Sequence, residues 1–114
     1  MPTALKSAEF VDTALDDLRA FPETARRAAG YQIDQVQHGR LPDDGKPMPS
    51  VGQGVQEIRI RDADGAYRVI YVAKFSQAVF ILHCFQKKSQ KTARADIELA
   101  TARYRKVVKG LQDD

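Results

Sequence analysis

A run of basic residues in the last third of the chain holds the side chains best suited to chemistry. Residues 83–91 are His-Cys-Phe-Gln-Lys-Lys-Ser-Gln-Lys, which combines an imidazole, an aromatic ring and three ammonium groups. Residues 86–109 contain eight basic and two acidic side chains, a charge of +6, whereas the rest contains ten basic and thirteen acidic ones, a charge of −3. One end of the fold is therefore predicted to bind anions, either nucleic acid or an acidic protein.

Three predicted strands must position these cations. Residues 55–61, 67–74 and 78–86 have the apolar content of strands and are separated by short connections. Connections of this length favour hairpins, so we expect an antiparallel meander. In the first strand Ile58 and Ile60 alternate with charged residues, whereas the second and third strands are apolar on both faces and belong at the centre of the sheet.

Two helices are expected before this sheet. Residues 10–20 place apolar side chains at helical spacing opposite acidic ones, with a short strand over 4–8 in front of them. A second helix is predicted to begin at Pro22 and to end at Gly39, so that the two form a hairpin. The segment 40–54 has three prolines and three glycines and is predicted to lack regular structure.

A last helix is expected over residues 92–109. Thr92 is the predicted N-cap, and Gly110 is the predicted stop. The helix has an apolar stripe formed by Ile97, Ala100, Tyr104, Val107 and Leu111. Its basic side chains are expected mostly toward solvent: Arg94, Arg103, Arg105, Lys106 and Lys109.

Length and composition fit one domain over residues 1–114. The chain is 43% hydrophobic and 29% charged, which supports one modest core of class α+β, with an N-terminal helix hairpin, a small antiparallel sheet of three to four strands and a C-terminal helix. No apolar run approaches the roughly 20 residues of a membrane span, and the first residues lack a secretory signal, so a cytoplasmic location is predicted. The single cysteine, Cys84, lies in an apolar strand and is interpreted as structural.

Three ordered motifs carry a family resemblance. They are Glu-Ile-Arg at 57–59, Tyr-Arg-Val-Ile-Tyr at 67–71, and Ile-Leu-His-Cys-Phe-Gln-Lys-Lys-Ser-Gln-Lys-Thr at 81–92. With them the chain resembles the RelE/ParE superfamily of toxins from type II toxin–antitoxin systems, and within it the HigB-like, phage-derived branch. The resemblance extends over nearly the whole chain and is strongest from residue 57 to residue 92. It implies a RelE-like fold.

The resemblance also implies an activity, metal-independent cleavage of mRNA on the ribosome. In that reaction a 2′-hydroxyl attacks the adjacent phosphate and the 5′-oxygen leaves, and preorganised cations stabilise the charge that gathers on the phosphate oxygens. Arg59 and Arg68 on neighbouring strands, with Lys87 and Lys88 at the end of the third, are predicted to converge there as catalytic residues. A lysine among cations has a lowered pKa, so Lys87 or Lys88 is a candidate base.

Further residues and partners follow from the same resemblance. Arg61, Lys91, Arg94 and Phe85 are predicted to bind RNA, and His83 is a candidate general acid. The implied partners are the ribosome, mRNA and a cognate helix-turn-helix antitoxin that covers the basic surface or an exposed sheet edge, with no membrane. The sequence has no P-loop, nucleotide fingerprint or metal-ligand spacing, so neither a cofactor nor a metal is expected.

The arginines also have structural interpretations. Arg59 and Arg61 fit the solvated face of an edge strand as well as they fit a catalytic role. Arg68 shares its face with apolar residues and needs a partner, for which Glu57 is the structural alternative to a phosphate.

The same holds for the imidazole and the aromatic ring. His83 is expected on the face of Val79, Ile81 and Phe85, which favours a hydrogen-bonded core histidine over a general acid. Core packing is also commoner than base stacking for a residue placed like Phe85.

Two other functions stay open. One is inhibition of DNA gyrase, as in ParE-like toxins, without nuclease activity, and the other is a nucleic-acid-binding module without toxicity. A gyrase inhibitor does not need a cluster that grips phosphate on its sheet. The set Arg59, Arg68, Lys87 and Lys88 therefore favours cleavage.

Overall fold

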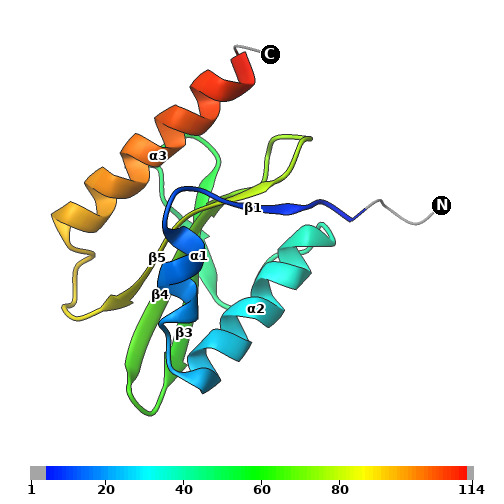
Figure 1. Cartoon of the computed structure of the whole chain (residues 1–114). Helices are drawn as coiled ribbons and strands as arrows, with labels where there is room; N and C mark the ends of the chain where they lie inside the picture. The colour runs from blue at the N-terminus through cyan, green and yellow to red at the C-terminus, as the bar shows by residue number, and fades with distance from the viewer. Residues whose placement is uncertain (1–4, 113–114) are drawn as a thin grey trace.

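A five-stranded sheet carries helices on both faces in the computed structural model, which describes residues 5–112 (Figure 1). The strands are β1 (Ala8–Phe10), β2 (Gly45–Pro47), β3 (Val55–Asp62), β4 (Gly65–Val72) and β5 (Val79–Lys87). The helices are α1 (Ala14–Arg19), α2 (Glu23–Gln37) and α3 (Arg94–Gln112). Helices α1 and α2 cover one face and α3 crosses the other, which confirms the predicted α+β class and its helix–sheet–helix order.

The sheet is mixed and has more strands than predicted. Its order is β1-β5-β4-β3-β2, and the antiparallel meander of β3, β4 and β5 is confirmed as its centre. The sheet has five strands where three to four antiparallel ones were expected, and β1 differs from the rest because it pairs in parallel with β5. Two parallel strands need a long connection, which here consists of helices α1 and α2 and strands β2 to β4.

The first strand lies later in the chain than predicted. A strand was expected over 4–8, of which residue 4 lies outside the described residues, and a helix over 10–20. Phe10 instead ends β1 and packs toward α1 and α2, while Val11 packs in the core under α3. Neighbouring side chains point to opposite faces in a strand, whereas the apolar side chains of an amphipathic helix share one face. The opposite directions of Phe10 and Val11 therefore fit the end of a strand and not the start of a helix. Asp12 then turns the chain with a φ of 51°, and α1 follows at Ala14.

The breaker-rich segment 40–54 contains a strand that the sequence did not indicate. Strand β2 runs antiparallel to β3, with Lys46 opposite Glu57 and Pro47 opposite Gln56. Only three residues long and exposed throughout, it forms one edge of the sheet. Pairing with β3 over so short a stretch outweighs the local preference of glycine and proline for turns. Strand β3 is therefore covered by β2 at residues 56–58, but β2 does not extend to Arg61.

A β-bulge in β5 corrects the expected position of His83. Tyr71 pairs with Ile81, but the preceding Ile70 pairs with His83, so Leu82 is an extra residue. Ile81 packs toward α1 and α2, whereas Leu82 packs in the α3 core and His83 contacts α3. The expectation that His83 shares a face with Val79 and Ile81 is therefore wrong.

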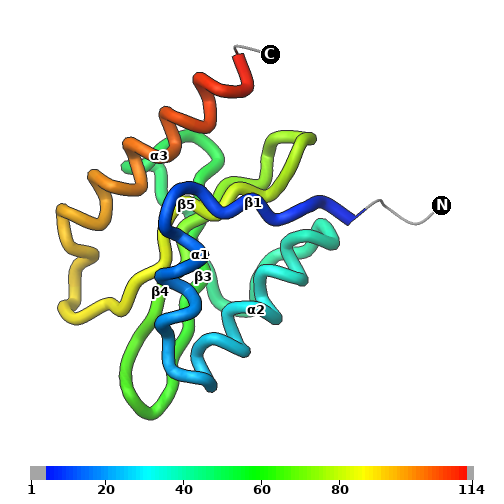
Figure 2. The backbone as a smooth tube through the Cα atoms, viewed as in Figure 1, coloured from blue at the N-terminus to red at the C-terminus, as the bar shows by residue number. Residues whose placement is uncertain are grey.

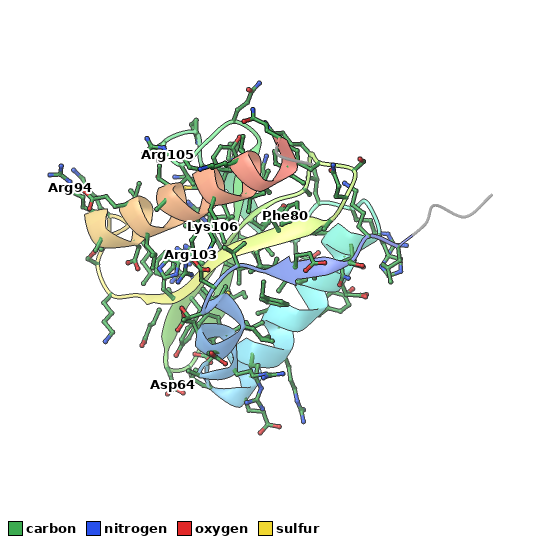
Figure 3. All side chains as sticks on the ribbon, turned by 45° about the horizontal axis from the view of Figure 1, so that its top comes forward. Asp64, Phe80, Arg94, Arg103, Arg105 and Lys106 are labelled. Carbon is green, nitrogen blue, oxygen red and sulfur yellow. The ribbon has the colours of Figure 1, made fainter. Side chains whose placement is uncertain are left out.

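Helix α3 begins and ends later than predicted. Its first residue is Arg94, so Thr92 lies before the helix, and Gly110 lies within it. The exposed position of Gly110 lets the helix continue at the modest cost of one glycine. Arg103 was expected toward solvent but is only 6% exposed, and Figure 3 shows it between α3 and the sheet.

Candidate functional site

Three of the predicted catalytic cations lie together on the α3 side of the sheet. In the strand register Arg59 lies opposite Arg68, and Arg68 lies opposite Phe85. Residues directly opposite one another project from the same face, and Lys87, two positions beyond Phe85, joins them. Adjacent strands thus bring Arg59, Arg68 and Lys87 to one surface, as the sequence predicted.

A buried carboxylate holds the two arginines. Glu57 is 2% exposed, and its Oε1 lies 2.9 Å from Nε of Arg59 and 3.6 Å from Nε of Arg68. Arg68 also donates from Nη1 to the Tyr67 carbonyl over 3.0 Å. Among residues 5–112, Glu57 Oε2 has no hydrogen-bond partner. One carboxylate therefore balances only one of the two guanidinium charges, and the surface keeps a positive excess.

The surroundings favour loss of a proton from Lys87. Burial, followed by the charge of Arg68, lowers the pKa of Lys87, while Glu57 acts in the opposite direction. Burial also lowers the pKa of Arg68, again opposed by Glu57. An arginine remains charged near neutral pH in such a setting, so Arg68 can bind an anion and Lys87 is the better placed of the two to exchange a proton.

Two neighbouring depressions open on this surface. The cationic depression, about 540 Å³, is lined by Arg61, Ala66, Arg68, Lys87, Lys88, Ser89 and Gln90. The mixed depression, about 430 Å³, is lined by residues 46–50, Glu57, Arg59, Lys87, residues 90–92 and Ile97. Lys87 and Gln90 belong to both. Figure 2 shows the two chain segments that frame the cationic depression, the β3–β4 hairpin and the β5–α3 connection, at the same end of the molecule.

His83 and Phe85 lie beneath this surface. His83 Nε2 lies 2.7 Å from Oδ1 of Asp96 in the first turn of α3, and its ring stacks on Phe85 with centroids 4.8 Å apart. His83 is 6% exposed and Phe85 is 9% exposed. Neither ring is free for a ligand in this arrangement, which favours the structural interpretation of both.

The remaining predicted residues divide between the two depressions and open solvent. Arg61 and Lys88 line the cationic depression, and Lys91 lines the mixed one. Arg94 is brought to neither depression, because it pairs with Glu98 at 2.9 Å and extends away from the start of α3 (Figure 3).

Sequence reasoning missed two residues of the site. Lys46 lies on β2 and lines the mixed depression, and Asp96 holds His83. Nothing in the segment 40–54 indicates that Lys46 returns to the sheet. The one signal that the sequence offers for Asp96 is that it is one of only two acidic residues in the basic region 86–109.

Other features lie away from these cations. Cys84 is buried in the core under α1 and α2, which confirms its structural interpretation, and burial raises the pKa of its thiol to about 12.

A further pocket of about 400 Å³, lined by Val36, Leu41 and Tyr71 among others, opens beside the end of α2. In the described part of the chain, no three His, Cys, Asp or Glu side chains are grouped so as to hold a metal ion. No helix in that part is both long and apolar enough to cross a membrane.

Comparisons with known proteins identify a family for the sequence and similar solved structures for the fold. Residues 16–105 match the family described as phage-derived Gp49-like proteins (DUF891). The chain is similar to the structure of a double arginine-to-alanine mutant of the E. coli toxin RelE in the free state, with a TM-score of 0.63 and 17% identity over 91% of this chain and 99% of that one. It is also similar to the isolated E. coli RelE toxin, with a TM-score of 0.53 and 17% identity over 93% and 98%. The sequence matches no curated protein.

Proposed function

The chain belongs to the family of phage-derived Gp49-like proteins, and with its RelE-like fold as a second premise we propose that it is the toxin of a type II toxin–antitoxin system. The proposed activity is cleavage of mRNA on the ribosome. The observation that carries the proposal is the cluster of Arg59, Arg68 and Lys87 on one face of the sheet, where they line two adjoining depressions. Assignment to the HigB-like branch is part of the same proposal.

The proposed chemistry needs charge stabilisation and proton transfer. The 2′-oxygen attacks the adjacent phosphorus, the bond from phosphorus to the 5′-oxygen breaks, and the products are a 2′,3′-cyclic phosphate and a 5′-hydroxyl. Arg68 and Arg59 stabilise the phosphate oxygens as charge gathers on them. Lys87, whose pKa is lowered, accepts the proton of the 2′-hydroxyl in its neutral form. The 5′-oxygen takes a proton from water as it leaves, which gives the 5′-hydroxyl. Lys88 lines the same depression and is the alternative base.

Glu57 has a positioning role in this scheme. It brings two guanidinium groups from neighbouring strands toward one carboxylate, which limits the positions they can take before RNA arrives. A phosphate bound in the cationic depression meets Arg68 and Lys87 without any carboxylate in the lining. The phosphate is therefore attracted by the positive charge that the single carboxylate of Glu57 does not neutralise.

The proposed partners include an antitoxin. An acidic segment would neutralise the cationic depression, whereas an extended segment would pair with the exposed edge strand β2. A short helix-turn-helix protein encoded beside this chain is the expected candidate, and its co-expression should restore growth.

Mapping the 5′ ends of cellular mRNA after expression from a tightly repressed promoter tests the proposal. We expect new ends within codons, in frame, and a loss of cleavage of at least roughly a hundredfold in Lys87→Met. Lys109→Met, an exposed lysine on α3, is the matched control and should cut like the parent. Growth arrest with intact mRNA and damaged DNA would support gyrase inhibition instead. Normal growth would exclude both kinds of toxin and leave a nucleic-acid-binding module.

A further inference from the structure

The two depressions beside Lys87 differ in chemistry, and the difference indicates two kinds of ligand group. The cationic depression has one apolar lining residue, Ala66, against four cations. The mixed depression has four apolar lining residues, Pro47, Met48, Pro49 and Ile97. An anion alone gains little from such a wall, because only an apolar ligand surface is stabilised by leaving water there.

Polar groups complete the mixed depression. Ser50, Gln90 and Thr92 offer hydroxyl and amide groups that can both donate and accept hydrogen bonds, and Lys46 and Lys91 add positive charge. A nucleotide needs this combination, because a base has apolar faces and polar edges and is joined to a phosphate. Arg59 lies in the same lining and adds a further positive charge on the side from which it meets the phosphate.

The wall is held in place by backbone contacts. Met48 donates its amide to the Val55 carbonyl over 2.8 Å, and Val51 donates to the Met48 carbonyl over 3.0 Å. On the opposite side the Ser89 hydroxyl donates to the Lys91 carbonyl over 2.7 Å, which fixes the turn that carries Gln90. Both sides are therefore formed before a ligand arrives, so binding needs little ordering of the chain.

We infer that the mixed depression is a nucleotide subsite that receives the base and ribose next to the phosphate held in the cationic depression, and that its lining sets the sequence preference of cleavage. This inference rests on the proposed function. Because Lys87 and Gln90 line both depressions, a nucleotide chain can pass from one to the other without leaving the surface. An acidic peptide suits the mixed depression less well than a nucleotide, because carboxylates use its cations but leave its four apolar lining residues without a partner.

The first test uses cleavage. Ser50 is exposed at the rim, so Ser50→Tyr fills the mixed depression without disturbing the core, and Ser76→Tyr in the exposed β4–β5 connection is the matched control. We expect Ser50→Tyr to keep cutting mRNA but to change the relative use of individual cut sites by roughly tenfold. Ser76→Tyr should keep the parent pattern. If the parent cuts and Ser50→Tyr shows the parent's pattern, the inference is wrong while the proposed function stands.

The second test does not depend on cleavage. Amide chemical shifts of the isotope-labelled protein are recorded with inorganic phosphate, with each nucleoside monophosphate and with an acidic peptide. We expect phosphate to shift amides around the cationic depression only, and nucleotides to shift those of Met48, Ser50 and Thr92 as well. If nucleotides and phosphate shift the same amides, or if only the peptide reaches the mixed depression, the inference fails. Nucleotide shifts there without any cleavage by the parent would keep the subsite and reject the nuclease.

Discussion

Arg103 of α3 donates a hydrogen bond from Nη1 to the backbone carbonyl of Leu82, the extra residue of the β5 bulge, over 2.9 Å. Its Nη2 donates to the Thr13 hydroxyl, also over 2.9 Å, and its Nε lies 3.7 Å from Oδ2 of Asp12. One buried guanidinium thus joins α3 to a central strand and to the turn between β1 and α1. Because α3 and the bulge also hold Asp96 and His83, this contact supports the floor of the site.

Replacement of that guanidinium should destabilise the fold. We expect Arg103→Met to lower the free energy of unfolding by about 2–4 kcal/mol, since it leaves the buried carbonyl of Leu82 without its donor and removes the guanidinium that links α3 to Thr13. Arg105→Met, two positions away on the exposed side, should change it by less than about 0.5 kcal/mol. Urea unfolding of the two variants and the parent measures both values. Equal losses in the two variants would mean that the contacts of Arg103 contribute nothing specific.

The position of Arg103 shows where sequence reasoning stops. It lies three residues after Ala100 and four before Val107, so its spacing belongs to the apolar stripe. Its charge favours an exposed position, whereas its spacing favours a buried one. The buried position is stable because the oxygens of Thr13 and Leu82 accept hydrogen bonds from the guanidinium. Those partners are 90 and 21 residues away in sequence. No local pattern predicts contacts at that distance.

The candidate site was predictable to the extent that it depends on regular pairing. Arg59, Arg68 and Lys87 lie on strands of a meander, and strand alternation with hairpin pairing is enough to bring them to one face. His83 was misplaced because a bulge leaves no mark in an apolar run, and Lys46 was missed because β2 forms only through pairing with β3. The bulge in β5 and the pairing of β2 with β3 both depend on contacts between segments that are distant in sequence.

Glu57→Gln should separate stability from RNA binding. Without the carboxylate, Arg59 and Arg68 lie opposite each other with no counter-charge, so we expect a loss of about 2–4 kcal/mol in the free energy of unfolding. The site gains one unit of positive charge, so binding of single-stranded RNA should tighten. Glu98→Gln, which breaks only the exposed pair with Arg94, is the control and should move stability by less than about 0.5 kcal/mol. Weaker RNA binding by Glu57→Gln would show that the positions Glu57 gives the arginines matter more for binding than the charge it balances.

Cys84 should be chemically silent in the folded protein. Burial raises the pKa of its thiol from 9.0 to about 12, so the thiolate fraction near neutral pH falls by roughly a thousandfold. We expect iodoacetamide to modify Cys84 rapidly in urea and hardly at all in buffer, as measured by mass spectrometry over time. Labelling at the same rate in both conditions would place Cys84 at the surface and contradict the packing of β5 against α1 and α2.

The pH dependence of cleavage tests Lys87 as the base. Burial and the charge of Arg68 lower its pKa below the ordinary value of 10.5, and the neutral amine is the form that accepts a proton. The rate of ribosome-bound mRNA cleavage should therefore rise roughly tenfold per pH unit above neutral pH and level off as the pH passes the lowered pKa. Glu57 opposes this lowering, so Glu57→Gln should move the plateau to lower pH. Lys87→Arg keeps the charge but cannot give a neutral base, so its rate should be low and nearly independent of pH. The parent's slope in Lys87→Arg would assign the proton transfer to another group, with Lys88 the next to test.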